Sequence, residues 1–212
     1  MSRIPRVGRS ASVDPERERI VIEGLRRSDP DAFDEAYAAC RPRVFGFLSR
    51  LSGRKDLAED LLQETFLRLA ARGDGLAADT RLLPWLFTVA RNLYVSDYRS
   101  RLLDADRMDQ LALAGTEAAT PTPFEEAAGS ELGQRLERAI ASLPPAYREV
   151  VLLVAVERLE PSEAAVVLFL SPEAVRQRLS RARGLLQDAL AEPDMNPRRA
   201  RKVLGQAKGV DR

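Results

Sequence analysis

The stretch LEPSEAAVVLFLSPEAVRQRLSRAR, from Leu159 to Arg183, decides the fold of the C-terminal half of the chain. Its apolar residues predict two helices, over about 161–168 and 172–190, joined by a turn of three or four residues. Ser171 is a suitable N-cap for the second helix, and Pro172 fits its first position, where a missing N–H costs nothing. The stretch therefore predicts a helix-turn-helix.

The second of these helices has one face for packing and one face suited to DNA. At about 100° per residue the packing stripe contains Val175, Leu179, Ala182 and Leu186. The other face carries Glu173, Arg176, Gln177, Arg178, Ser180, Arg181 and Arg183. Arginine and glutamine can form paired hydrogen bonds with the edges of guanine and adenine, and glutamate can accept a hydrogen bond from cytosine. Flanking arginines can neutralise backbone phosphates. The alternative is an amphipathic helix with a solvated arginine-rich face.

Composition excludes most enzyme classes. The 212 residues include no histidine and one cysteine, Cys40, which excludes zinc fingers, nucleophilic triads and histidine general bases. We expect no catalytic residue, no metal site, no cofactor and no enzymatic activity. Cys40 favours a small buried hydrophobe over a redox sensor. No signal peptide or membrane span is predicted, so we expect a cytoplasmic protein that is not inserted in a membrane.

The periodicity predicts an all-α protein with two helical domains. Residues 1–13 are predicted to form a flexible basic arm, and residues 14–101 a four-helix bundle in which Pro42 kinks or breaks the second helix. Residues 102–131 form an acidic linker, residues 132–191 contain the helix-turn-helix, and residues 192–212 are a basic tail. No strand pattern or phosphate-binding loop is present in the sequence.

The predicted helix from Lys55 has a buried stripe and a second face that suggests a docking surface. The stripe contains Leu57, Ala58, Leu61, Leu62, Thr65 and Leu69, and the second face carries Glu59, Asp60, Gln63, Phe66 and Leu67. Apolar residues rimmed by polar ones are typical of partner-binding surfaces. Burial of Phe66 under a loop of the same domain is an equal alternative.

The predicted helix from Pro84 interleaves aromatic and basic residues opposite its core side. The core side contains Trp85, Leu86, Val89, Ala90 and Leu93, and the opposite side contains Phe87, Arg91, Tyr94, Val95, Tyr98 and Arg99, with Asn92 at the margin. Unstacked bases need flat partners and their backbone needs cations, so this face is suited to single-stranded DNA. The alternative is a helix buried on two sides.

Three segments together resemble a known family. DLAEDLLQETFLRLA (56–70) resembles the polymerase-binding helix in region two of extracytoplasmic-function sigma factors, which are specificity subunits of bacterial RNA polymerase. WLFTVARNLYVSDYR (85–99) resembles their promoter-melting segment. LPPAYREVVLL (143–153), with the helix-turn-helix, resembles their region four. The resemblance covers about residues 16–101 and 132–190, in the expected order.

The resemblance implies a protein that binds core RNA polymerase and directs promoter-specific initiation. Asp60, Gln63, Glu64 and Phe66 would face the β′ clamp helices, and Arg91, Asn92, Tyr94, Tyr98 and Arg99 would lie at the opened minus-ten element. Glu173, Arg176, Gln177, Ser180, Arg181 and Arg183 would meet the minus-thirty-five major groove, and the surface around 147–153 would approach the β flap. The linker would run toward the RNA exit path. The resemblance also implies an anti-sigma partner and a location at the bacterial nucleoid.

The sequence departs from the family pattern at several positions. Ser96 stands where the family usually has aspartate, and Phe169 occupies a turn position usually held by glycine, where a positive φ strains a bulky residue. The first helix of the motif has Glu160-Pro-Ser162 and Ala164 where the family has larger anchors. Two rival functions therefore stay open: a polymerase-independent helix-turn-helix regulator, with residues 14–101 as a sensor or dimerisation domain, and a helical adaptor or decoy.

Overall fold

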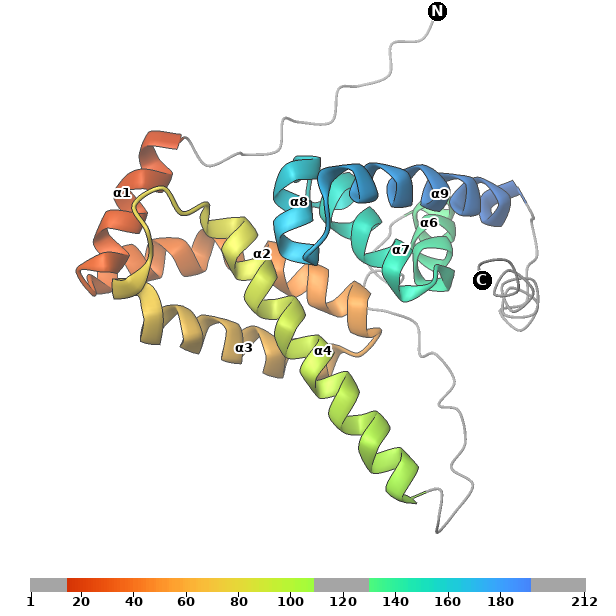
Figure 1. Ribbon diagram of the computed structural model, residues 1–212, viewed down its shortest axis with the longest axis horizontal. Coiled ribbons are helices and arrows are strands. Elements are labelled where there is room, and N and C mark those ends of the chain that lie inside the picture. The colour runs from red at the N-terminus through yellow and green to blue at the C-terminus, as the bar shows by residue number, and fades with distance from the viewer. Residues whose placement is uncertain (1–14, 109–129, 192–212) are drawn as a thin grey trace, which may run out of the picture.

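A computed structural model describes residues 15–108 and 130–191, and every regular element within these ranges is helical (Figure 1). The prediction of an all-α protein is confirmed. The predicted basic arm, the predicted basic tail and residues 109–129 of the predicted linker lie outside the described residues.

The first helices form an N-terminal bundle, residues 15–108. They are α1 (Pro15–Arg26), α2 (Pro30–Ser52), α3 (Lys55–Arg72) and α4 (Leu82–Met108), with a short 3₁₀ turn, η1 (Gly73–Gly75), after α3. Asp29 caps α2 by accepting a hydrogen bond from the Asp31 N–H at 3.0 Å, and Gly53 ends α2 with a φ of 68° that glycine adopts without strain. The helix α4 continues to Met108, beyond its predicted end near 101, and its C-terminal end projects away from the other helices (Figure 1).

Pro42 does not break α2. It lies inside the helix, which continues through it to Ser52. Pro42 has no N–H to donate to the Ala38 carbonyl, and both residues are exposed. The missing hydrogen bond therefore lies on the solvent-exposed side of the helix, where a proline is better tolerated than in the core.

The later helices form a C-terminal domain, residues 130–191. They are α6 (Glu131–Ser142), α7 (Pro145–Val150) with a π-helical turn, η2 (Val151–Val156), then α8 (Pro161–Leu168) and α9 (Pro172–Ala191). Ser130 caps α6, and the Ser171 hydroxyl accepts from the Ala174 N–H at 3.1 Å at the start of α9. The predicted helix-turn-helix and its cap are confirmed.

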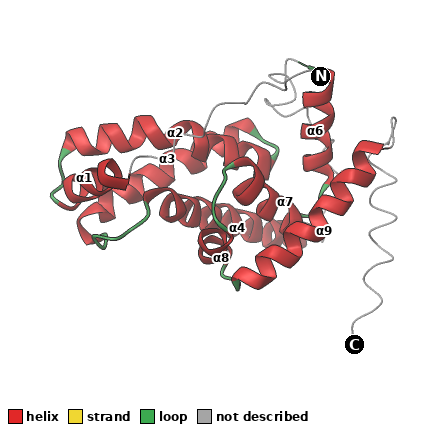
Figure 2. Cartoon of the chain, turned by 90° about the horizontal axis from the view of Figure 1, so that it is seen from above, coloured by secondary structure: helices red, strands yellow, loops and turns green. Residues whose placement is uncertain are grey.

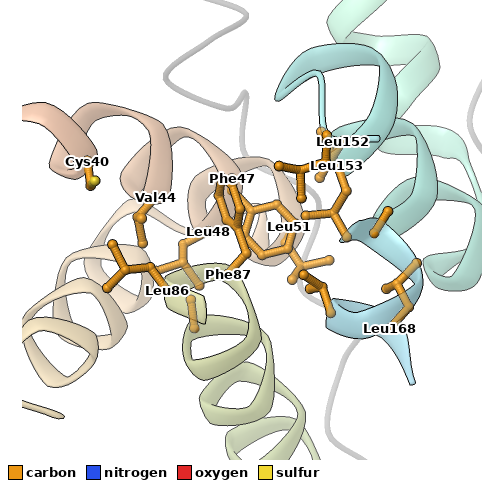
Figure 3. Close-up of a cluster of buried hydrophobic side chains, with 14 of the residues drawn as sticks. Cys40, Val44, Phe47, Leu48, Leu51, Leu86, Phe87, Leu152, Leu153 and Leu168 are labelled. Carbon is orange, nitrogen blue, oxygen red and sulfur yellow. The ribbon is translucent and has the colours of Figure 1, made fainter. Parts of the chain in front are cut away.

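The bundle and the C-terminal domain share one continuous hydrophobic core. Leu152 and Leu153 of η2 point toward Phe47 and Leu51 of α2 (Figure 3). The rings of Phe47 and Phe87 meet edge to face with centroids 5.2 Å apart. The helix α8 packs against α4, and the two lie side by side when seen from above in Figure 2. The two predicted domains therefore pack against each other in this structure, which the sequence analysis did not predict.

Candidate nucleic-acid interface

The helix α9 separates a buried stripe from an exposed polar face, as the sequence analysis predicts. Val175, Leu179 and Ala182 are 0%, 7% and 0% exposed. On the other face Arg178 is half-buried, and the remaining side chains are exposed: Glu173, Arg176, Gln177, Ser180, Arg181 and Arg183. The Arg176 guanidinium donates to the Glu173 carboxylate at 3.1 Å, so these two side chains hold each other on the surface. The face carries three exposed arginines, one half-buried arginine and one exposed glutamate.

The turn between α8 and α9 contains a residue in the left-handed backbone conformation, and that residue is not a glycine. Phe169 has a φ of 55° and a ψ of 46°, and its side chain is 69% exposed. Its N–H donates to the Val166 carbonyl at 3.3 Å, and the Leu170 N–H donates to the Ala165 carbonyl at 2.9 Å. These bonds satisfy two of the four carbonyls in the last turn of α8. The turn therefore has the geometry of the motif, with the strain of a bulky residue at positive φ.

The aromatic and basic face of α4 is divided into a covered part and an open part. Phe87, which the sequence analysis placed on this face, is 0% exposed and packs on Phe47. That placement is wrong because α2 and α8 cover the first half of α4, so the alternative of a helix buried on two sides holds there. Farther along, Tyr98 is 51% exposed, and Asn92 and Arg99 are exposed.

Two tyrosines provide flat surfaces on the open part of α4. The rings of Tyr94 and Tyr98 are stacked, with centroids 6.3 Å apart and an interplanar angle of 26°. Tyr94 is half-buried, and this burial raises the pKa of its hydroxyl. The Tyr94 hydroxyl therefore stays protonated at neutral pH and is a hydrogen-bond donor.

Arg91 forms an ion pair with a residue of the C-terminal domain. Its guanidinium donates two hydrogen bonds, both 3.1 Å long, to the carboxylate of Glu149 on α7. The two side chains are 19% and 9% exposed. Glu149 lies in the segment 147–153 that was predicted to approach the β flap, but its pairing with Arg91 was not predicted, because no local pattern relates two positions 58 residues apart. In this conformation Arg91 is not available to DNA.

The exposed face of α3 differs from the prediction at one residue. Asp60 and Gln63 are exposed, and Glu64 is half-buried and pairs with Arg68 at 2.9 Å. Phe66 is only 3% exposed, because its ring packs on Tyr37 and Phe33 of α2 with centroid distances of 4.8 and 6.4 Å. The expectation that Phe66 faces a partner is therefore wrong for this conformation, and it is α2 that covers the ring. The exposed apolar residue of this face is Leu67, at 56%.

The segment 147–153, predicted to approach the β flap, lies mostly in the core. Val150, Val151, Leu152 and Leu153 are between 0% and 3% exposed, and Tyr147 is half-buried. These apolar residues are buried because α7 and η2 sit between α9 and the N-terminal bundle. Only the start of α7, at Pro145 and Ala146, is open to solvent.

Cys40 is a core residue. Its side chain is 1% exposed, and burial raises the pKa of its thiol to about 12. The prediction of a small buried hydrophobe is confirmed. Across residues 15–108 and 130–191, no helix is long and apolar enough to cross a bilayer.

Known proteins match this chain over both helical units. The family model for Sigma-70 region 2 matches residues 36–102, and the model for Sigma-70, region 4 matches residues 133–186. RNA polymerase sigma factor CarQ of Myxococcus xanthus is 33% identical over 174 residues, which covers 82% of this chain and 98% of that relative. ECF RNA polymerase sigma factor EcfG of Rhodopseudomonas palustris is 32% identical over 160 residues, covering 76% and 86%.

Two solved structures share the fold. The sigma factor RpoE, in complex with the anti-sigma factor NepR from Bartonella quintana, superposes with a TM-score of 0.64 at 28% identity, covering 76% of this chain and 98% of that chain. CnrH, in complex with the cytosolic domain of CnrY, gives a TM-score of 0.62 at 22% identity, covering 84% and 99%. The second likeness shows the fold alone.

Proposed function

This chain belongs to the extracytoplasmic-function group of RNA polymerase sigma factors, and from that premise we propose which of its surfaces perform each step of promoter recognition. Its function is to direct promoter-specific initiation of transcription with RNA polymerase. Sigma factors are non-enzymatic initiation factors. The predicted domains, 14–101 and 132–191, are proposed as the two promoter-reading units, with the linker 102–131 running between them toward the RNA exit path.

The face of α9 is proposed to read the minus-thirty-five element. Arg176, Gln177 and Arg181 are exposed on one side of a helix that is anchored by Val175, Leu179 and Ala182. Glu173, Ser180 and Arg183 complete the face. In a major groove such side chains discriminate bases by about 1–3 kcal/mol for each good paired contact. This exposed arginine face on the second helix of the motif, within the region 4 match, is the observation that carries the proposal most directly.

The open part of α4 is proposed to hold the melted minus-ten strand. The stacked rings of Tyr94 and Tyr98 offer surfaces for unpaired bases, a contact worth about 1–3 kcal/mol per base. Asn92 and Arg99 are exposed beside them. Arg91 joins this set only after its pair with Glu149 separates.

The exposed face of α3 is proposed to bind the β′ clamp helices. Asp60, Gln63 and Glu64 supply its polar groups, and Leu67 supplies an exposed apolar contact at its centre. An apolar residue inside a polar rim is the usual arrangement of a protein-binding surface.

We also propose an anti-sigma partner for this chain. Support comes from the two structural neighbours, of which one is a complex with the anti-sigma factor NepR and the other a complex with the cytosolic domain of CnrY. The proposed location is the cytoplasm, with nucleoid association while the chain is bound to polymerase on promoter DNA.

Transcription by purified core polymerase with variant chains tests these assignments separately. Arg181→Ala should weaken discrimination of the minus-thirty-five sequence by about 1–3 kcal/mol while polymerase binding stays unchanged. Tyr98→Ala should slow promoter opening, and Asp60→Arg should weaken polymerase binding itself. Gln134→Ala, an exposed change on α6 outside the proposed faces, is the control. Equal behaviour of Arg181→Ala and Gln134→Ala on altered minus-thirty-five elements would overturn the assignment of α9.

A further inference from the structure

Two strained residues flank the first helix of the helix-turn-helix. Phe169 follows α8, and Arg158, with a φ of 58°, precedes it. This left-handed backbone conformation is strained for any residue that has a Cβ, whereas glycine adopts it freely. Strain that persists in a folded protein points to a function at that position. The proposed α9 face gives Arg158 no such function.

The residues on either side of Arg158 fix it in this conformation. The Glu157 N–H donates to the Leu152 carbonyl at 2.8 Å, and the Leu159 N–H donates to the Leu153 carbonyl at 2.9 Å. Glu157 and Leu159 are only 7% and 6% exposed, whereas Arg158 between them is exposed. Because both neighbours are anchored inside the fold, the side chain at position 158 is held at the surface.

The glutamates near Arg158 in the sequence are paired with other arginines. Glu157 pairs with Arg43 at 2.9 Å, and Glu163 of α8 pairs with Arg81 at 3.3 Å. In the part of the chain that the structure describes, the Arg158 side chain forms neither an ion pair nor a hydrogen bond. No polar contact within this part of the chain offsets the strain, so the guanidinium is available to a partner.

DNA bound to the α9 face would bring a phosphate to this end of α8. In a helix-turn-helix the second helix enters the major groove while the first helix crosses the backbone. The turn at Phe169 joins α8 to the start of α9, the end that enters the groove. The helix α8 has 8 residues, so it is about 12 Å long, close to the width of the major groove. With α9 in the groove, the start of α8 therefore lies over the phosphates that border it.

We propose that Arg158 binds a backbone phosphate beside the minus-thirty-five element and thereby positions the α9 face in the groove. This inference rests on the proposed function of α9. A guanidinium can donate two parallel hydrogen bonds to one phosphate. Because phosphates are the same in every sequence, the contact contributes affinity and register but no base discrimination. It is a contact that glycine, the residue without strain at this position, cannot make.

Three substitutions separate the charge of Arg158 from its backbone strain. Arg158→Gly removes both the charge and the strain, Arg158→Ala removes the charge and keeps the Cβ, and Arg158→Lys keeps the charge and the Cβ. Arg138 is an exposed arginine on α6, in the same domain and outside the proposed DNA faces. Arg138→Ala is therefore the matched loss of one positive charge.

Binding is measured with the full chain in complex with core RNA polymerase. The probe is a labelled duplex that carries a minus-thirty-five element identified by runoff transcription and ends before the minus-ten element. This duplex has no segment to be melted, so promoter opening does not enter the measured affinity. Affinity is recorded at several potassium chloride concentrations, on this element and on one with altered bases. Urea denaturation of the free chains measures their stability.

Arg158→Ala should bind more weakly and with a smaller salt dependence. Over about a fourfold rise in salt, the wild-type complex should lose about three- to fourfold more affinity than the variant complex, the effect of one phosphate contact. The ratio of wild-type to variant affinity should be the same on both versions of the element. Arg158→Lys and Arg138→Ala should both keep the wild-type salt dependence. Arg158→Gly should bind as weakly as Arg158→Ala, while its urea midpoint rises above that of the wild type.

Three results would contradict this account, and they are distinguishable. A wild-type salt dependence in both Arg158→Ala and Arg158→Gly would overturn the phosphate contact, while the proposed function of α9 would stand. A loss of affinity confined to the unaltered element would show that Arg158 reads bases and does not bind a phosphate. If no chain, wild type included, directs polymerase to a specific element, the proposed function fails and this inference fails with it.

Discussion

The guanidinium of Arg91 donates two hydrogen bonds, each 3.1 Å long, to the carboxylate of Glu149 across the boundary between the N-terminal bundle and the C-terminal domain. A residue of the proposed minus-ten face is thereby paired with a residue of the domain that is proposed to read the minus-thirty-five element. The pair links the DNA-binding surface of one unit to the position of the other.

We expect Arg91 and Glu149 to be energetically coupled in the free chain. Removing either partner leaves a charged group without its main hydrogen bonds, and such bonds contribute about 1.5–3 kcal/mol. Arg91→Met and Glu149→Gln should each lower the free energy of unfolding, and the double variant should lose less than the sum. Urea denaturation of the four proteins measures the coupling. Additive losses would mean that the two groups do not interact in solution.

Unfolding of the helical core should be one cooperative transition. Because Phe47, Phe87, Leu152 and Leu153 lie in one cluster, neither unit can unfold without exposing the core of the other. Trp85 is the only tryptophan and lies in α4, so its fluorescence follows the N-terminal bundle, while far-ultraviolet circular dichroism follows all helices. The two probes should give coincident denaturation curves. Separate midpoints would show that the two units are independent.

Neighbouring residues of α3 should have opposite roles. Phe66→Ala removes a ring that is 3% exposed and should lower the free energy of unfolding by about 3–5 kcal/mol. Leu67 is 56% exposed, so Leu67→Ala should leave stability within about 0.5 kcal/mol and weaken polymerase binding. Thermal melts and a binding titration distinguish the two effects. A stable Phe66→Ala chain that has lost polymerase binding would restore Phe66 to the docking face.

Glycine at position 169 should stabilise the protein. Phe169 is held at a φ of 55°, which costs a side chain with a Cβ roughly 1–2 kcal/mol, and its ring is 69% exposed. Phe169→Gly should therefore raise the free energy of unfolding by about 1 kcal/mol. Phe169→Ala removes the ring but keeps the Cβ, and it should give no such gain. Equal stabilities for glycine and alanine would show that the turn is not strained in solution.

Cys40 should be inert to thiol reagents in the folded chain. Burial raises the pKa of its thiol from 9.0 to about 12, so the thiolate is scarce in the folded state between pH 7 and 9. Because the folded pKa is raised, ionisation of this thiol opposes folding as pH rises above 9.0. Labelling with an aromatic disulfide should be slow in the native chain at both pH 7 and pH 9, and rapid in denaturant. Fast native labelling that increases with pH would contradict the burial.

Local features of the sequence were sufficient for the helices, their caps and the helix-turn-helix. Ser171 and Pro172 begin α9 where the pattern placed them, and the α9 face is exposed as its periodicity indicated. These features depend on residues a few positions apart, and the helical repeat of 3.6 residues per turn is enough to predict them. The family resemblance followed from segments of this kind.

The packing of distant segments against each other could not be predicted from these local patterns. Periodicity gives the side of a helix on which Phe66 or Phe87 lies, but not which other element covers that side. The pairs Arg91–Glu149, Arg50–Glu137 and Arg43–Glu157 join residues 58, 87 and 114 positions apart. No local signal distinguishes these glutamates from solvent-exposed ones, so the closed arrangement of the two units became apparent only in three dimensions.

The central claim, that this chain directs polymerase to promoters, is tested most directly by runoff transcription from a genomic fragment library. Purified core RNA polymerase is assayed with and without the full-length chain. The account predicts new, sequence-specific start sites that appear only when the chain is present and share an upstream and a downstream element. Polymerase that binds the chain but gains no specific start site would contradict the claim.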